Sequence, residues 1–452
     1  MKKGALSVPE EEHVLSRRLN DFFRLEERQT TVKTEFLAAL TTFMTVSYII
    51  LVNPIILSEA GIPKEAALAG TIFAIVITTL LMGLWANLPI VIGPGMGLNA
   101  FFTYTVVLGQ GLSWETALGA VFISGLVFFL LSITGISSKV VAAIPKTLKA
   151  SITAGIGLFV AFIGLKNGGI IVPDDSTYIA LGNIGEQGTW LALLGLILAA
   201  VLVSRNVRGG LILSIFAVTV IAMIIGYSPV PGSIKDVFSF EMPSVQMTFL
   251  KLDIMAAIGY GIFSVIFSFT IVELFDTLAT LIGLTKKANL NNENDETPYM
   301  KRALTTGAIG TMISAIFGST AMNTYIENAT GISEGGRTGL KAVFAALLFL
   351  LTLLFTPLIQ FIPSAATAPV LIIIGAFMMT ELKAVNFDDL TELIPAFLTI
   401  IMMPLTFSIA EGVAFGFISF TLLKLFSGRR KELHWMMYII TAAFFINFYT
   451  ML

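Results

Sequence analysis

The chain is a succession of long apolar runs with few charges between them. An α-helix needs about 20 apolar residues to cross a bilayer, and many of the runs reach that length. Charged residues make up only 12% of the chain, whereas they make up about 25% of a soluble domain. The sequence therefore predicts an all-α polytopic membrane protein.

Hydropathy along the chain predicts fourteen crossings in two groups of seven, separated by a polar stretch at 227–253. A final apolar run at 434–450 fits either a further crossing or a helix in the interface, and the sequence leaves both open. The fourteen expected crossings are 34–57, 66–87, 91–109, 114–135, 141–165, 189–204, 210–226, 255–284, 300–318, 320–331, 337–361, 366–379, 393–408 and 411–427.

The basic residues predict the orientation, because loops on the cytoplasmic side carry an excess of Lys and Arg. With the N-terminus inside and fourteen crossings, nearly all of the 27 basic residues fall inside, Arg337 and Lys341 among them. The outside keeps Lys64, Lys166, Lys235 and Lys251. We therefore expect a multi-pass protein of the cytoplasmic membrane with its N-terminus in the cytoplasm.

These patterns divide the chain into five parts. Residues 1–33 are charged and amphipathic, which indicates a cytoplasmic tail ending in an interfacial helix rather than a cleavable signal. The others are a first seven-span repeat at 34–226, an extracellular connection at 227–253, a second seven-span repeat at 254–427, and a basic segment followed by an apolar helix at 428–452.

Seven crossings per half make the second half enter from the opposite side, so homology between the halves would be an inverted repeat. The third and tenth expected spans are short and interrupted, by "GPGMGLNAFFTYT" and "GSTAMNTYIENATGISEGG". Each is followed by a similar fourth span, "ALGAVFISGLVFFLLS" or "GLKAVFAALLFLLTLL". Interrupted spans at matching positions of two halves point to the binding site of a transporter.

Breaking a helix at membrane depth has a physical consequence. Non-helical backbone survives there only where protein buries it or where it lines a cavity. Two broken spans would bring two helix N-termini, with unpaired N–H groups and positive dipole ends, close together near the midplane. Such ends suit a ligand with carbonyl groups and ring nitrogens. The alternative is that the glycines only let helices pack closely.

Three acids lie deep in expected spans, namely Glu273, Asp276 and Glu327. Such residues are costly in a membrane and mark function by default. Glu273 and Asp276 are three residues apart and share a helix face. No basic residue lies in the same spans, and Arg337 is the nearest candidate from a neighbour. Carboxylates without a cationic partner accept protons readily, so we expect proton coupling, against the alternative of a structural carboxyl at a helix break.

The remaining composition excludes several classes. The chain has no Cys and only two His residues, His13 and His434, both beside charged tails. This leaves no thiolate or His cluster for a metal or a catalytic nucleophile, and we expect no cofactor, no metal and no enzymatic activity. The net charge of −2 gives no case for nucleic-acid binding.

Five motifs follow one another in order: "SYIILVNPIIL", "GPGMGLNAFFTYTVV", "ELFDTLATLIGL", "NTYIENATGISEGGRTGL" and "AATAPVLIIIGAFM". Together they resemble the AzgA-like branch of the nucleobase permeases, related to uracil and xanthine permeases, over about residues 20–430. Members of that branch take up hypoxanthine, guanine and adenine. The resemblance implies a uracil-permease-like fold of seven-plus-seven inverted repeats, a core and a gate domain, proton symport and commonly a homodimer.

The family's purine-site positions fall on Asn99, Asp276 and Glu327, with Asn328 adjacent, and Gly97 and Thr277 complete the expected substrate-binding set. The resemblance implies proton coupling at Asp276, Glu327 or Glu273. More distant permeases carry a carboxylate nearer the position of Glu273, so which eighth-span acid touches the substrate stays open. Carboxylates and an amide can read the N–H donors and ring nitrogens of a purine.

The sequence therefore predicts proton-coupled uptake of purine nucleobases by alternating access. The preferred purine, whether guanine, hypoxanthine or adenine, stays open. One alternative is an anion exchanger of the same fold, which would need a basic residue near the broken helices to bind the anion. The other is a uracil or xanthine permease. Stacking partners for the ring would come from Phe101, Phe102, Tyr104 or Phe275.

Overall fold

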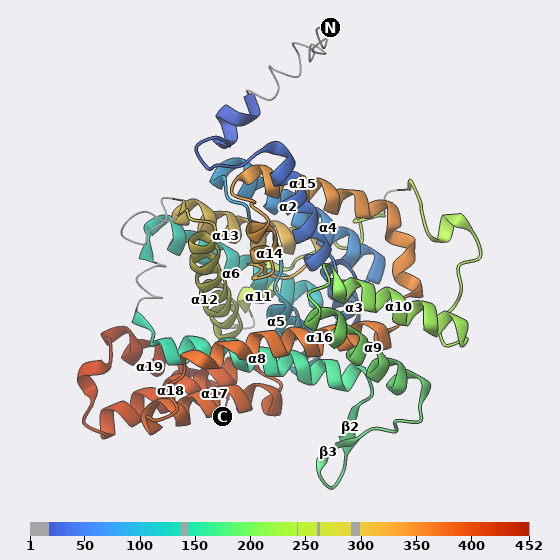
Figure 1. The fold of residues 1–452 in the computed structure, drawn as a ribbon. Helices are drawn as coiled ribbons and strands as arrows, with labels where there is room; N and C mark the ends of the chain where they lie inside the picture. Colours follow the sequence, from blue (N-terminus) through green and yellow to red (C-terminus); the bar gives the residue numbers. More distant parts are fainter. Residues whose placement is uncertain (1–17, 137–142, 242, 260–262, 291–298, 452) are drawn as a thin grey trace.

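The computed structural model describes residues 18–136, 143–241, 243–259, 263–290 and 299–451. Helices dominate (Figure 1), and two pairs of short strands complete the fold. Nine helical segments of these residues are long and apolar enough to cross a membrane, and four shorter apolar helices accompany them. The expected tail at 1–17 and parts of the expected spans at 141–142 and 260–262 lie outside the described residues.

The first half of the chain contains helices close to each expected span. The first span is one helical segment, Val32–Glu59, which a turn at Ser47 and Tyr48 divides into α2 and α3. The elements are α2 (Val32–Val46), α3 (Ile49–Glu59), α4 (Lys64–Leu81) with the π-helical turn η1 (Met82–Ala86), β1 (Ile92–Pro94), α5 (Met96–Ala100), η2 (Phe101–Gly109), α6 (Trp114–Thr134), α8 (Lys146–Asn167), β2 (Ile171–Asp174), β3 (Tyr178–Leu181), α9 (Gln187–Ser204) and α10 (Gly210–Ile224).

The second half follows the same order after a connection that contains one 3-10 turn, η3 (Ile234–Asp236). Its elements are α11 (Ile254–Gly259), α12 (Phe263–Lys287), α13 (Met300–Phe317), β4 (Met322–Thr324), α14 (Asn328–Ser333), α15 (Gly339–Leu351), η4 (Thr352–Phe361), α16 (Ser364–Met378), η5 (Met379–Ala384), α17 (Leu390–Thr406), α18 (Ile409–Phe426), η6 (Arg430–Glu432) and α19 (Trp435–Met451). The apolar run at 434–450 is thus a single helix, which packs against α18.

Side-chain caps and prolines define where several helices begin. Thr31 accepts a hydrogen bond from the Thr34 N–H at the start of α2, and Ser113 accepts one from the Thr116 N–H at the start of α6. Pro145 precedes α8, where its missing N–H costs nothing because the first helical N–H groups have no partner within the helix. These local signals make the helices begin close to the starts of the apolar runs.

The interruptions expected in the third and tenth spans are observed. In each span the helix is replaced by a short strand, and β1 and β4 pair antiparallel with Gly93 opposite Asn323. A short helix follows each strand, α5 after β1 and α14 after β4. Two segments more than 200 residues apart in sequence therefore complete each other's backbone hydrogen bonds inside the protein, as non-helical backbone requires at membrane depth.

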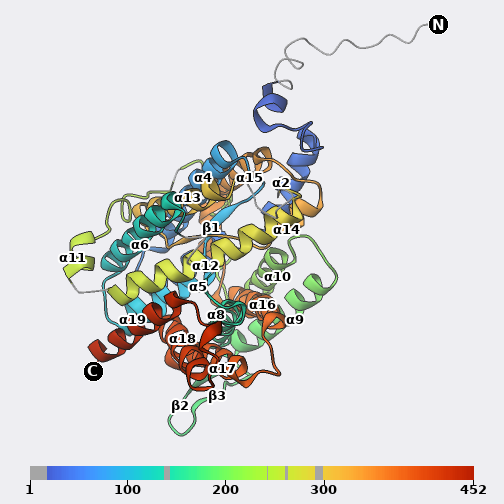
Figure 2. The same ribbon diagram turned by 90° about the vertical axis from the view of Figure 1, so that its left-hand side faces the viewer.

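The helices form two bundles (Figures 1 and 2). The core bundle consists of α2–α6 and α11–α15, together with β1 and β4, and lies in the upper part of Figure 1. The gate bundle consists of α8–α10 and α16–α18 and lies below it. Each bundle draws on both halves of the chain, so matching elements of the two halves pack together rather than one half against the other.

Glycines let the helices at the centre of each bundle touch through their backbones. Gly157 of α8 faces Gly375 of α16 so closely that a methyl group on either would collide with the other's carbonyl oxygen. Gly83 and Gly339 make the same kind of contact between η1 and α15. Small residues at such crossings are typical of helix packing in membranes.

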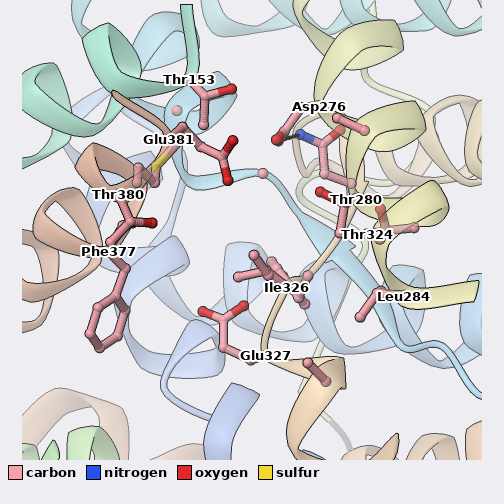
Figure 3. A pocket seen from close by; sticks show the side chains of 18 of the residues that line it. Thr153, Asp276, Thr280, Leu284, Thr324, Ile326, Glu327, Phe377, Thr380 and Glu381 are labelled. Carbon is pink, nitrogen blue, oxygen red and sulfur yellow. Dashed lines mark hydrogen bonds between the residues drawn. The ribbon is translucent and has the colours of Figure 1, made fainter. Parts of the chain in front are cut away.

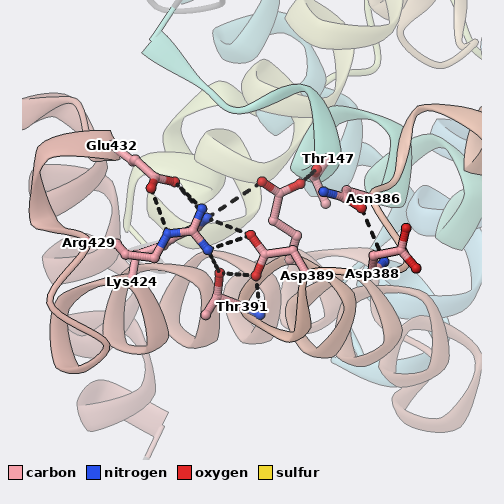
Figure 4. A network of polar contacts seen from close by, with 9 residues as sticks. Thr147, Asn386, Asp388, Asp389, Thr391, Lys424, Arg429 and Glu432 are labelled. Atoms are coloured by element: carbon pink, nitrogen blue, oxygen red, sulfur yellow. Dashed lines mark hydrogen bonds and ion pairs between the residues drawn. The ribbon is translucent and has the colours of Figure 1, made fainter.

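Buried charges tie the ends of the gate helices together (Figure 4). The Lys424 side chain of α18 is only 1% exposed, and its Nζ lies 3.3 Å from Asp389, 3.5 Å from Glu392 and 2.8 Å from Glu432. Arg429 adds an ion pair to Asp389 at 2.6 Å. A buried ammonium needs several acceptors to offset its loss of water, and this network supplies three.

The acids of this network lie at or near the ends of their helices, and Asp389 directly precedes α17. Hydrogen bonds from Thr391, and then from Arg429 and Lys424, hold the pKa of the Asp389 carboxyl well below its usual range. The network also reaches α8, because the Thr147 hydroxyl donates a hydrogen bond to Glu392. The ends of α8, α17 and α18 are therefore held together at one side of the gate bundle.

Lys341, one of the basic residues that the sequence assigns to the inner side, lies near the start of α15, and its side chain is fully buried. Its Nζ donates to the Pro89 carbonyl at 2.8 Å and lies 3.3 Å from the Asn328 carbonyl. These carbonyls flank the broken spans, where free backbone acceptors can hold an ammonium.

The glycine crossing of the gate bundle can be tested by adding one methyl group. In Gly375→Ala the new Cβ would overlap the Gly157 carbonyl and lie about 2.7 Å from Ala161, so we expect a loss of about 1–3 kcal/mol of stability. The measurement is the thermal unfolding midpoint of the purified protein in detergent. The matched control is Gly307→Ala in α13, whose Cβ would meet its nearest atoms at 3.7 Å, an ordinary contact. Equal midpoints for the two variants would contradict the packing described.

Candidate functional site

A cavity of about 610 Å³ lies between the core bundle and the gate bundle. Its lining comes from both bundles, and Figure 3 shows the side chains that face it. The core bundle contributes Tyr48, Gly95, Met96, Gly97, Asp276, Ala279, Thr280, Gly283, Leu284, Lys287, Asn323, Thr324, Tyr325, Ile326, Glu327 and Ala329, and the gate bundle contributes Lys146, Lys149, Ala150, Thr153, Ile374, Phe377, Met378, Thr380, Glu381 and Ala384.

The broken spans form the middle of the core wall. Gly95, Met96 and Gly97 bring the start of α5 to the cavity, and residues 323–327 bring the end of β4 and the turn before α14. Close approach requires glycine here, because a Cβ on Gly95 would lie 2.7 Å from the Asn323 amide and one on Gly97 would overlap Ile156 of α8. Among the predicted site residues, Gly97 therefore lines the cavity where the two bundles meet.

Asp276 reaches the cavity from α12. The Asn323 side-chain amide donates a hydrogen bond to Asp276 Oδ2 at 2.5 Å. Because Asn323 belongs to β4, this contact ties the acid to the paired strands. Among the described residues the other carboxylate oxygen, Oδ1, has no hydrogen-bond partner, so it can accept from a ligand.

Glu327 is the second acid of the cavity. It stands at the residue before α14, and Tyr48 donates a hydrogen bond from its hydroxyl to Glu327 Oε1 at 3.1 Å. Tyr48 itself lies in the break between α2 and α3. No Lys or Arg of the described chain forms an ion pair with Asp276 or Glu327, so the core wall carries two acceptor groups without a bound cation.

Three further predicted residues lie behind the wall instead of lining the cavity. The Asn99 side chain is fully buried and accepts a hydrogen bond from the Thr320 hydroxyl, which joins α5 to the segment before β4. Thr277 is also buried and donates to Asn323 Oδ1 at 3.2 Å, which orients the amide that holds Asp276. Thr277 thus contacts Asp276 indirectly, through Asn323, whereas Asn99 joins the two broken spans.

Asn328 joins the two broken spans through their backbones. Its amide accepts from the Val91 N–H at 2.8 Å and donates to the Val91 carbonyl at 2.9 Å and to the Tyr325 carbonyl at 2.8 Å. The Asn328 amide thereby pairs with both backbone groups of Val91, as a neighbouring strand would do next to β1. Asn328 is also the first residue of α14, directly after Glu327.

Glu273 lies one turn from Asp276 but does not reach the cavity. Its side chain is fully buried, and Oε1 accepts a hydrogen bond from Thr311 of α13 at 2.5 Å. Thr311 also accepts from the Met322 N–H at 2.9 Å, so this acid supports the start of β4. The geometry therefore brings together Gly97, Asp276 and Glu327 and separates them from Glu273.

The gate wall contains residues that the sequence reasoning missed. Figure 3 shows Glu381 of η5 beside Thr153 of α8, on the side of the cavity opposite Asp276. Phe377 of α16 supplies a ring at the same wall. The expected stacking rings lie elsewhere, since Phe101, Phe102, Tyr104 and Phe275 do not line this cavity. Only the stretch "GAFMMTEL", which runs across the end of the predicted span 366–379, could have drawn attention to this wall.

The cavity reaches one end of the helices that border it. Lys146 and Lys149 line it at the start of α8, and Lys287 lines it at the end of α12. The interior thus combines acceptors at its centre with ammonium groups toward that end. Such a cavity suits a small, flat ligand with several N–H donors. Among the described residues no group of three or more His, Cys, Asp or Glu side chains is arranged to hold a metal ion.

Comparison with known proteins identifies the family. The model of the Permease family matches residues 33–415. Adenine permease AdeP of Escherichia coli is 40% identical over 429 residues, which cover 95% of this chain and 95% of that protein. Guanine/hypoxanthine permease PbuO of Bacillus subtilis is 39% identical over 435 residues, which cover 94% of this chain and 99% of that protein.

Solved structures share the fold at low identity. The transmembrane domain of the cyanobacterial bicarbonate transporter BicA superposes with a TM-score of 0.62 at 16% identity, over 84% of this chain and 97% of that one. The structure of SLC26A9 superposes with a TM-score of 0.64 at 10% identity, over 94% of this chain and 73% of that one. Together with the sequence relatives, these matches show that the chain belongs to the permease family and is a multi-pass membrane transporter rather than an enzyme.

Proposed function

We propose that this permease takes up purine nucleobases, namely guanine, hypoxanthine or adenine, and binds them in the cavity between the two bundles. The observation that carries the proposal is the pair of acids on the core wall, Asp276 and Glu327, each oriented by one hydrogen bond and neither paired with a cation. Carboxylates accept hydrogen bonds in pairs from neighbouring N–H groups, and purines display such groups along their edges. The relatives named above, an adenine permease and a guanine/hypoxanthine permease, support the same substrate class.

Within this site Asp276 and Glu327 are the residues proposed to touch the substrate, and Gly97 is proposed to line the site where α5 meets Ile156 of α8. Asn99, Thr277 and Asn328 are proposed to act from behind, because their hydrogen bonds hold the segments that carry the acids. Of the three rings that line the cavity, those of Tyr48, Tyr325 and Phe377, Phe377 is the one proposed to stack on a purine.

Anion exchange is the second candidate, since BicA is a bicarbonate transporter with the same fold. An anion would need donors or cations at the centre of the cavity. Here the centre presents two carboxylates, and the lysines lie toward one end. Like charges at a binding centre cost several kcal/mol (about 1–4 at an effective dielectric of 20–80), so the charge pattern favours a neutral nucleobase.

We further propose proton symport. Asp276 and Glu327 lie in a protein interior without a cationic partner, where a carboxylate favours its neutral form. A proton taken up with the base would remove the repulsion between the two acids and supply an additional donor. Glu273, which faces Thr311 rather than the cavity, is proposed to be structural.

Alternating access would use the two bundles as its moving parts. We propose that residues 34–226 and 254–427 are inverted seven-span repeats, fourteen crossings in all. The first to fourth and eighth to eleventh spans lie in the core bundle and the others in the gate bundle, as a repeat of this kind requires. The proposed setting is the cytoplasmic membrane with the N-terminus inside, so the end of the cavity at Lys146 and Lys287 opens to the cytoplasm. A homodimer is the proposed assembly.

The substrate class can be tested by uptake in cells that lack their own purine permeases. We expect saturable accumulation of labelled guanine, hypoxanthine or adenine, because the acids of the cavity select N–H donors on a small ring. Competition with unlabelled bases ranks the three purines, and we expect nucleosides not to compete, because the ribose replaces a ring N–H donor. Strong transport of uracil or bicarbonate with no purine uptake would refute the assignment.

The proton coupling can be tested by the dependence of uptake on external pH. Because the empty site must take up a proton from outside, the rate should fall as external pH rises, and a protonophore should abolish accumulation. The measurement is initial uptake in proteoliposomes with imposed pH gradients. Accumulation driven equally well by a sodium gradient at clamped pH would contradict symport.

The two acids of α12 provide a matched pair of substitutions. Asp276→Asn keeps the shape of the side chain but removes the ionisable group that faces the cavity, so accumulation should fall at least about tenfold. Glu327→Gln should behave in the same way. Glu273→Gln lies one turn away and out of the cavity, so it should retain at least partial transport. Protein abundance in the membrane and purine binding to the purified variants serve as controls, and normal uptake by Asp276→Asn with none by Glu273→Gln would reverse the assignment.

A further inference from the structure

A second polar cluster joins the two bundles away from the cavity. The Asn167 side chain, at the end of α8, donates from Nδ2 to Glu59 Oε1 at 3.0 Å and to Tyr104 Oη at 3.0 Å. Glu59 ends α3 and Tyr104 lies in η2, and both belong to the core bundle. One amide of the gate bundle is thus held by two side chains of the core bundle.

Aromatic rings extend this contact across the bundles. Lys166 Nζ lies 5.3 Å from the centre of the Tyr104 ring and 5.5 Å from the centre of the Phe407 ring, so a single ammonium bridges them. The Phe407 ring also packs edge-on against Phe162 at 5.3 Å between centres. The Thr105 hydroxyl of η2 donates to the Phe407 carbonyl, which adds a backbone link to the same place.

Phe407 adopts a conformation that favours this contact. It ends α17 with a φ of 54°, in the left-handed region that a bulky residue rarely adopts. The surrounding contacts must therefore compensate for the cost of that conformation. Its carbonyl accepts a hydrogen bond from Thr105 of the core bundle, and its ring contacts the Lys166 ammonium of α8, which also lies over the Tyr104 ring of the core bundle.

The cluster lies at the closed end of the interface between the bundles. Along α8 the cavity is lined by Lys146, Lys149, Ala150 and Thr153, and the lining stops there. One turn further, Ile156 packs against Gly97 without space between them. Asn167 follows three turns later, where its hydrogen bonds to Glu59 and Tyr104 join the two bundles directly. The interface is therefore open at the Lys146 end of α8 and closed at the Asn167 end.

We propose that Asn167, with Glu59, Tyr104 and Phe407, forms the external gate of this permease, and that Asn167 is the positioning residue that holds the gate closed. The proposal rests on the proposed transport by alternating access, in which the Asn167 end faces outside. Opening would separate Asn167 from Glu59 and Tyr104 and let water reach the cavity from that side. Water can replace each of these hydrogen bonds, so their net contribution is small, as a contact that breaks in every cycle requires.

The absence of Cys from the sequence makes the test direct. A single Thr153→Cys substitution places a thiol in the cavity wall of an otherwise cysteine-free chain. A membrane-impermeant maleimide is added from outside to intact cells, or from inside to inverted vesicles, and the labelling rates are compared. With the gate intact, labelling should be fast from inside and slow from outside.

Adding Asn167→Ala to this background should raise the labelling rate from outside at least about threefold, because both hydrogen bonds to the core bundle are lost. Tyr104→Phe removes one of the two and should give a smaller increase, and it also serves if Asn167→Ala does not fold. The matched control is Asn183→Ala, an exposed amide after β3 whose hydrogen bond is local, to Gly185. It should leave both rates unchanged.

The outcomes separate the gate from the substrate assignment, because labelling requires no transport of any ligand. Faster external labelling with Asn167→Ala and Tyr104→Phe, but not with Asn183→Ala, would support the gate even if no purine is taken up. Unchanged external labelling in both folded gate variants would overturn it, even if purine uptake by the unmodified protein is established. Equal increases in all three variants would also overturn it, because they would indicate general loosening.

Discussion

The pairing of β1 with β4 is the interaction on which the rest of the structure depends. A backbone that leaves the helix inside a membrane protein must satisfy its N–H and C=O groups locally, and here each broken span satisfies the other. Asn328 extends the pairing by binding both backbone groups of Val91, and the Tyr325 hydroxyl donates to the Pro94 carbonyl at 2.7 Å. Because the strands are fixed in this way, the helix starts that follow them and the acids beside them have fixed positions.

Two buried charges support the same region and take no part in the cavity. The Glu35 carboxylate of α2 accepts hydrogen bonds from the N–H groups of Arg337 at 2.8 Å and Lys341 at 3.1 Å, and so caps the start of α15. The Lys341 ammonium in turn holds the Pro89 carbonyl before β1. The Arg337 guanidinium donates hydrogen bonds to the Ile332 and Gly336 carbonyls rather than to an acid of the cavity. The cations nearest the broken spans are thus committed to backbone, which leaves Asp276 and Glu327 without a counter-ion.

The sequence predicted the helices, the two breaks and the acids because each leaves a local signal: apolar length, glycine inside a span, or a charge inside a span. It could not predict which polar residues face the cavity. Asn99 and Asn323 both neighbour a break, but the register that sets Gly93 opposite Asn323 depends on pairing between halves, which no local pattern reveals. For the same reason Glu273 and Asp276 share a helix face in sequence, yet only Asp276 meets Asn323. Glu381 was missed because an acid just after a span resembles an ordinary loop residue.

The division into bundles determines how the site can move. Both broken spans and both acids belong to the core bundle, so the part of the site that is proposed to bind N–H donors would stay intact if the bundles shifted. The gate bundle contributes Thr153, Phe377 and Glu381 to the lining of the cavity, and a shift of the bundles would move them away from the acids. Glu381 lies across the cavity from Asp276, and two carboxylates that approach in a closing cavity repel each other unless a proton or a donor lies between them. Under the proposed function, closure over an empty, deprotonated site would therefore be disfavoured by the same acids that are proposed to bind the ligand, which would link movement of the gate bundle to occupancy of the cavity.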